Sequence, residues 1–239
     1  VYKRQVYNPV SSFMQPRDDK GEFIRNFSPD DYTPHICESN GWQYFWSVQQ
    51  DIDGLIVLTG GKERFAQKLD SMFTYNPSAD DELPIFSTGM IGQYAHGNEP
   101  SHHVIYLFNA VDQPWKTQKR IRQMLKTWFR NDLMGMPGDE DGGGMTSFVV
   151  FSSLGFYPVT PGLPVYNIGS PLFTNTKITL DNGSIFEIDA QNASDENKYI
   201  QSATLNGQEW NKPWFSHDDL KNGGTVSYTH LTLPTNSLV

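Results

Sequence analysis

The first two thirds of the chain carry apolar residues at helical spacing. After a pair of glycines, Phe65, Leu69, Met72 and Phe73 stand at positions i, i+4, i+7 and i+8, which places them on one face of a helix. The preceding segment 41–59 is apolar on nearly every side. That pattern is typical of a continuous helix buried within an all-α layer.

A second amphipathic helix is predicted to begin at Pro114, because proline is favoured in the first turn. Its apolar stripe comprises Ile121, Met124, Leu125, Trp128 and Phe129. Its opposite face is basic and is expected to lie in water: Lys116, Lys119, Arg122 and Lys126.

The pattern changes to β structure after a proline-rich stretch that ends at Pro164. Apolar residues flank Asp181-Asn182-Gly183, where asparagine and glycine favour the positive φ of a tight hairpin turn. Asn-Gly pairs recur at 206–207 and 222–223. We therefore expect antiparallel strands in the C-terminal quarter.

The two ends resemble peptides that arise when sequencing-adapter DNA is translated. We therefore expect residues 1–5 and 226–239 to be non-native. Between them, residues 6–164 are expected to form a helical domain and residues 165–225 a β region. The chain begins without methionine and is interpreted as a piece of a longer protein.

The amino-acid composition argues against several classes of function. The 239 residues include 27 acidic and 18 basic side chains, for a formal net charge of −9. A nucleic-acid-binding protein needs a basic face, so this balance argues against nucleic acid as a partner. No apolar run reaches the roughly 20 residues of a membrane-spanning helix. A single cysteine, Cys37, excludes an internal disulfide and a multi-cysteine zinc site.

An acidic loop is the first candidate for chemistry. Asp139, Glu140 and Asp141 lie between a Pro-Gly pair and three glycines, just before an apolar helix-like run. These acids can cap that helix, because its free amides stabilise negative charge. Alternatively, Asp139 and Asp141 project to the same side of an extended loop and activate a water or bind a hard cation.

A lone acid is the second candidate. Glu38 precedes a small polar pair and then the aromatic residues Trp42 and Tyr44. Glu38 can be an electrostatic cap of the helix that follows. In the alternative interpretation, the aromatic surroundings desolvate its carboxyl group and keep the proton that a general acid donates. Aromatic platforms also suit sugars.

The third candidate is the segment 97–103, which contains Glu99, His102 and His103. Adjacent histidines diverge on a helix and no His-Glu-x-x-His spacing is present, which disfavours zinc. Glu99 and His102 are three residues apart and can share a face that binds a hydroxyl-rich ligand. A proline-started helix with satisfied histidines is the structural alternative.

Together these segments resemble the catalytic region of glycoside hydrolase family 92, the calcium-dependent exo-acting α-mannosidases. The resemblance extends over roughly residues 10 to 225. Six motifs occur in the expected order, and the other three are Asp51–Ile56, Gln113–Gln118 and Leu154–Val159. The family fold implies part of an (α/α)6 helical toroid, followed by antiparallel β strands. It also implies an N-terminal β-sandwich domain, absent from this chain, that packs on it.

The resemblance also implies roles for individual residues. Glu38 looks like the general acid, and Asp141 with Asp139 looks like the general base of an inverting hydrolase that removes terminal α-linked mannose from glycans. Calcium is the implied cofactor, with Gln93, Asn98 and Glu99 as candidate oxygen ligands. The candidates for substrate contact are Trp42, Glu99, His102 and His103. The family implies a secreted, periplasmic or cell-surface location.

Two other functions compete with this hypothesis. A non-catalytic carbohydrate-binding protein would keep the fold and the aromatic residues, yet the presence of all three acids argues against it. A glycoside phosphorylase would need a phosphate cradle of basic and hydroxyl residues, and no such cluster accompanies the acidic loop. Because the chain is shorter than the family's catalytic region, we expect it to have little activity by itself.

Overall fold

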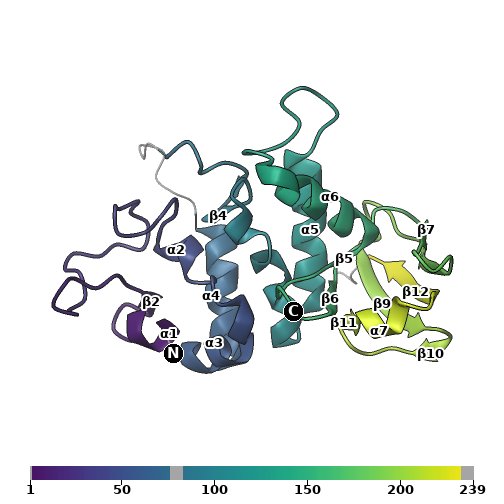
Figure 1. The fold of residues 1–239 in the computed structure, drawn as a ribbon, viewed down its shortest axis with the longest axis horizontal. Coiled ribbons are helices and arrows are strands. Elements are labelled where there is room, and N and C mark those ends of the chain that lie inside the picture. The colour runs from purple at the N-terminus through teal and green to yellow at the C-terminus, as the bar shows by residue number, and fades with distance from the viewer. Residues whose placement is uncertain (1, 76–82, 233–239) are drawn as a thin grey trace. The chain divides into compact units, whose positions relative to one another are not determined.

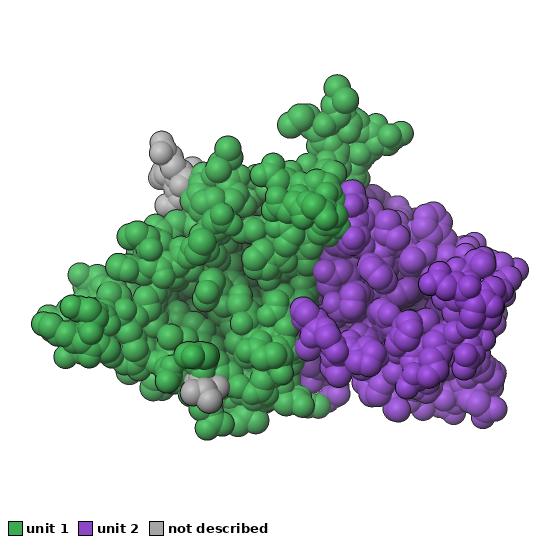
Figure 2. Space-filling view, in the orientation of Figure 1, with its two compact units in different colours: residues 1–104, 128–145 green, residues 105–127, 146–239 purple. Residues whose placement is uncertain are grey.

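The computed structural model describes residues 2–75 and 83–232, and these form two compact units (Figure 2). One unit contains residues 1–104 and 128–145, and the other contains residues 105–127 and 146–239. Each unit is therefore assembled from two separate stretches of the chain. This division places two of the long helices in the same unit as the C-terminal strands. The expected domain limits at residues 164 and 225 stay predictions.

The first unit consists mainly of short helices and loops (Figure 1). Its elements are α1 (Tyr2–Val6), β1 (Tyr7–Asn8), β2 (Phe13–Met14), α2 (Gly41–Tyr44), η1 (Gln49–Asp51), α3 (Ile52–Thr59), α4 (Lys62–Thr74), β3 (Met90–Ile91), β4 (Tyr94–Ala95), η2 (Glu99–Ser101) and η4 (Asp141–Gly143). Strands β1 and β2 pair antiparallel, as do β3 and β4. Helix α4 confirms the apolar stripe that the spacing predicts, because Phe65, Leu69, Met72 and Phe73 are all buried.

The segment 41–59 does not form the continuous helix that its apolar pattern predicts. The chain breaks because Asp51 begins a new helix, α3: its Oδ1 accepts a hydrogen bond from the Gly54 backbone N–H at 2.9 Å. The side chains at the break stay in the core nonetheless. Phe45 and Trp46 are buried, so the apolar pattern reports burial here and not a helix.

The remaining elements lie wholly or mainly in the second unit. They are η3 (Val104–Val111), α5 (Pro114–Trp128), α6 (Gly144–Leu154), β5 (Phe156–Tyr157), β6 (Val165–Ile168), β7 (Asn175–Thr179), β8 (Ile185–Gln191), β9 (Tyr199–Leu205), β10 (Gln208–Glu209), β11 (Trp214–Ser216), α7 (His217–Leu220) and β12 (Gly224–Leu231). Helix α5 begins at Pro114 as predicted. No helix in the described ranges is long and apolar enough to cross a bilayer.

The larger sheet is mixed, and this corrects the expectation of purely antiparallel strands. Its order is β10-β9-β12-β8-β7, with β12 antiparallel to β9 but parallel to β8. The predicted hairpin around residues 181–183 is confirmed as the antiparallel pair β7–β8. Between β10 and β12 the chain runs through β11 and α7, and only such a crossover lets β12 lie parallel to β8.

Strand β12 occupies the interior of this sheet. Every second residue along it is buried, namely Val226, Tyr228 and His230, as expected when side chains alternate between the two faces of a sheet. Val226 and Tyr228 join the apolar core of the second unit. That residues 226–239 are non-native stays a prediction, and residues 233–239 lie outside the described part of the chain.

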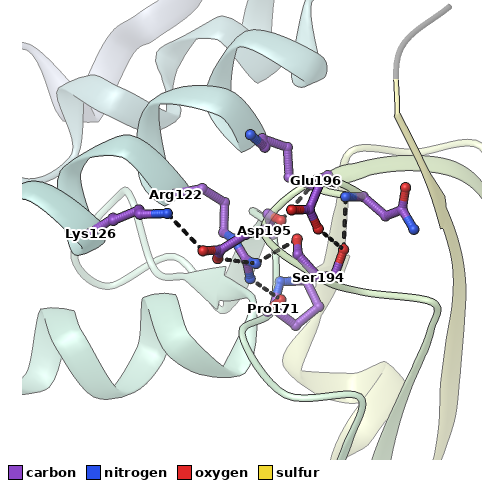
Figure 3. Close-up of polar contacts among 9 residues, drawn as sticks. Arg122, Lys126, Pro171, Ser194, Asp195 and Glu196 are labelled. Carbon is purple, nitrogen blue, oxygen red and sulfur yellow. Dashed lines mark hydrogen bonds and ion pairs between the residues drawn. The ribbon is translucent and has the colours of Figure 1, made fainter.

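One side chain of α5 contradicts the predicted basic face. Arg122 is 8% exposed and lies inside the second unit, not in water. Its guanidinium donates to the carbonyl oxygens of Pro171 at 2.8 Å and Ser194 at 2.7 Å, and it pairs with Asp195 (Figure 3). Lys126, one turn later, stays exposed and also pairs with Asp195. A planar cation with several donors suits two carbonyl oxygens at once, and helical period alone cannot reveal these partners.

Candidate active site

Three loops of the first unit bring the predicted site residues together. The first loop contains Glu38, the second is the segment 97–103, and the third is the acidic loop with Asp139 and Asp141. The Asn98 side-chain amide donates to the Glu38 carbonyl oxygen at 3.3 Å, which joins the first loop to the second. Gly138 adopts a positive φ of 70°, and a Cβ there would overlap the backbone of Gly97. The acidic loop therefore reaches the second loop only because residue 138 is glycine.

The two residues expected to act as acid and base share an uncommon backbone conformation. Glu38 and Asp141 both have φ of 50°, in the left-handed region that side chains other than glycine rarely adopt. Both side chains are exposed. Strained backbone of this kind is held in place by surrounding contacts and concentrates at functional sites.

Glu99 faces the acidic loop. Burial raises the pKa of its carboxyl group, and a hydrogen bond and the charge of Asp141, with the charge of Asp139, raise it further. Its Oε1 is buried and receives no N–H or O–H donor from the described residues. The neighbouring carboxylates and burial therefore favour the protonated form of Glu99.

Glu140 has a different role from its two neighbours. Its Oε2 accepts the Gly143 backbone N–H at 2.5 Å, and its carbonyl oxygen accepts the Met145 N–H at 3.3 Å. This is the capping interaction that the acidic loop was also expected to make. Within one loop, the middle acid holds the backbone while Asp139 and Asp141 lie near Glu99.

Gln93 and Asn40 form a buried amide pair. The Asn40 side-chain amide donates to Gln93 Oε1 at 2.9 Å, and Asn40 Oδ1 caps α2 by accepting the Gln43 N–H at 3.1 Å. Asn40, two residues after Glu38, is thus the capping residue, a role that Glu38 was also considered for. As Gln93 Oε1 already accepts one bond, a cation would have to use its second lone pair.

Trp42 is enclosed on several sides. Its Nε1–H donates to Asp30 Oδ1 at 2.7 Å, and its ring stacks on Tyr75 with centroids 5.7 Å apart. Phe13 packs against it edge-to-face at 4.8 Å. Lys68 lies over the same cluster. The sequence interpretation overlooked Lys68, although it stands three residues after Phe65 and four before Met72, on the edge of the α4 apolar stripe.

The paired histidines are buried and bonded to the backbone. A ring nitrogen of His102 lies 3.1 Å from the His96 carbonyl oxygen, and one of His103 lies 2.8 Å from that of Trp46. Burial lowers the pKa of each to about 4, so both are neutral at neutral pH. In the described ranges no three His, Cys, Asp or Glu side chains form a metal-binding group. Substrate contact by either histidine stays a prediction.

Comparison with known proteins gives a consistent result. A family model described as the glycosyl hydrolase family 92 catalytic domain matches residues 2–231. Among curated proteins, an uncharacterized secreted glycosidase of Arthroderma benhamiae is 33% identical over 196 residues, which cover 80% of this chain and 23% of that protein.

Solved structures agree. A family GH92 α-mannosidase from Bacteroides thetaiotaomicron in complex with mannoimidazole is 35% identical, with a TM-score of 0.89 over 96% of this chain and 31% of that one. An inverting mannosidase of the same family and species is 37% identical, with a TM-score of 0.86 over 97% and 32%. The chain thus spans about a third or less of the length of these relatives. Because the family match includes every loop of the candidate site, the chain belongs to glycosyl hydrolase family 92.

Proposed function

We propose that the protein is an exo-acting α-mannosidase that removes terminal α-linked mannose from glycans with inversion of configuration. The observation that carries this proposal is that two acids with strained backbone, Glu38 and Asp141, lie on loops that both contact residues 98–99. The printed names of the solved relatives, an α-mannosidase and an inverting mannosidase, support the substrate and the stereochemistry. The secreted glycosidase among the relatives supports action outside the cell.

In the proposed mechanism one carboxyl group acts as general acid and another as general base. Glu38 donates a proton to the departing glycosidic oxygen, while Asp141, supported by Asp139, takes a proton from the water that attacks the anomeric carbon. Inversion requires these acids to stand roughly 6.5–9.5 Å apart so that the water fits between base and sugar. The helices of the chain would form part of an (α/α)6 toroid around this site.

One feature of Glu99 supports the calcium ion that the proposal includes. Glu99 Oε1 is a buried carboxylate oxygen without a donor, and calcium prefers such hard oxygen ligands. The amide oxygens of Asn98 and Gln93 would complete the protein's share, since Asn98 uses its NH₂ group toward Glu38. A calcium ion held there would bind sugar hydroxyls and favour ring distortion. Glu38 and Asp141 would still carry out both proton transfers.

The test uses the full-length protein with α-mannosides of good and poor leaving groups. Glu38→Gln should lose roughly 10²-fold or more in kcat on poor leaving groups and far less on activated aryl mannosides, which need no protonation. Asp141→Asn should be slow on both. Glu140→Gln is the matched control, because it removes an acid of the same loop whose carboxylate accepts the Gly143 backbone N–H, and it should stay near wild type.

Calcium is examined in the same assay. Chelation should abolish turnover and added calcium should restore it. Equal losses on both substrate classes for Glu38→Gln would contradict its role as the acid. Full activity in chelator would contradict the calcium site. A wild-type protein that binds mannosides without hydrolysing them would overturn the proposal and favour the carbohydrate-binding alternative.

A further inference from the structure

Lys68 of α4 points its ammonium group into a cage of aromatic rings. Nζ lies 3.2 Å from the ring centroid of Phe13, 4.6 Å from that of Phe45 and 5.3 Å from that of Trp42. The rings also contact one another, with Phe13 edge-on to Trp42 at 4.8 Å and to Phe45 at 6.0 Å. The faces of aromatic rings carry partial negative charge, which attracts a cation placed over them. One ammonium group therefore contacts and stabilises three rings at once.

In the ranges that the structure describes, no carboxylate pairs with Lys68, which is unusual for a partly buried lysine. Burial lowers the pKa of its ammonium group to about 7. The acid attached to the cage, Asp30, is bonded instead to Trp42 Nε1 and the Tyr75 hydroxyl. Desolvating an unpaired cation costs stability. Departures of this kind from ordinary packing concentrate where function requires them.

The cage holds the short helix that follows Glu38. Trp42 lies in α2 and Phe45 directly follows it, whereas Phe13 comes from β2. A helix of four residues has little stability of its own and depends on such contacts. Its first residue follows Asn40, which is two residues from Glu38 and is anchored to Gln93.

We propose that Lys68 is a positioning residue for the general acid: by holding α2 through the aromatic cage, it fixes the direction in which Glu38 presents its proton. This inference rests on the proposed function of Glu38. Lys68 itself touches no reacting atom. Its loss should therefore resemble a partial loss of the acid and not a general loss of structure.

The experiment measures kcat/KM of the full-length protein at pH 6, where Lys68 is mostly protonated. Lys68→Met should lower kcat/KM about tenfold on mannosides with poor leaving groups, a fraction of the roughly 10²–10⁴ that a general acid supplies, and less than twofold on activated aryl mannosides. Lys68→Arg keeps a cation that stacks on aromatic rings and should restore most of the loss. Lys62→Met, at an exposed lysine of the same helix, should match wild type.

A second measurement judges the proposal even if the enzyme assay fails. With 5-fluorotryptophan, the ¹⁹F resonance of Trp42, assigned with Trp42→Phe, should shift in Lys68→Met and keep its position in Lys62→Met. An unmoved resonance would overturn the proposal. So would equal losses on both substrate classes in Lys68→Met while Glu38→Gln shows the leaving-group pattern. If Glu38→Gln itself lacks that pattern, the assignment of the acid fails, and the resonance alone decides whether Lys68 holds α2.

Discussion

At the scale of single residues, the carboxyl group of Glu99 makes stability depend on pH. Burial, with Asp141 and Asp139, raises the pKa of Glu99 in the folded chain above its value in the unfolded chain. Its stabilising contribution is therefore complete below the unfolded pKa and is lost as pH rises through the folded pKa. We predict that Glu99→Gln, measured in chelator, raises the melting temperature at pH 7, and that this gain shrinks toward pH 4.

The matched control for this prediction is Glu140→Gln. It removes one charge from the same acidic region, but the Glu140 carboxylate accepts a backbone N–H, a charge-assisted bond that the amide of Gln makes more weakly. Its melting temperature should fall slightly or stay unchanged at pH 7. A Glu99→Gln gain that is equal at pH 4 and pH 7 would show that ionisation of Glu99 is not its source.

At the scale of elements, α5 is attached to the loops of the second unit through a buried cation. Arg122→Met would leave the carbonyl oxygens of Pro171 and Ser194 without a donor (Figure 3). Because hydrogen bonds to charged groups are strong when buried, we predict a loss of about 3 kcal/mol in the free energy of unfolding. Lys126→Met, which removes an exposed ion pair to Asp195 that water screens, should cost far less. Urea denaturation of the two variants checks this, and equal losses would contradict it.

At the scale of the whole molecule, each compact unit needs two stretches of chain. The sheet of the second unit depends on α5, since Gln118 Oε1 accepts the Ile200 N–H at 3.1 Å and Arg122 binds two loops. We predict that a fragment of residues 105–239 unfolds cooperatively in denaturant, whereas a fragment of residues 146–239 does not. Near-ultraviolet circular dichroism follows both. A cooperative transition with the same midpoint in the shorter fragment would show that α5 is dispensable.

Local patterns in the sequence predicted several features correctly. The apolar stripe of α4 and the hairpin at residues 181–183 depend on neighbours within a few residues, so the sequence contains their causes. The family resemblance rests on six short motifs in order, and the match over residues 2–231 confirms it. The chemical roles of Glu38, Asp139 and Asp141 rest on the same resemblance, and they stay predictions.

Only the tertiary structure decided which distant groups meet. The partners of Arg122 lie 49 to 73 residues away, and Lys68 meets rings from two other elements. The parallel pairing of β12 with β8 likewise depends on the path of the chain between them. Apolar periodicity reports only whether a position is buried. A buried cation is stable where donors, carbonyls or rings from other parts of the chain surround it, and the folded chain alone brings those groups together.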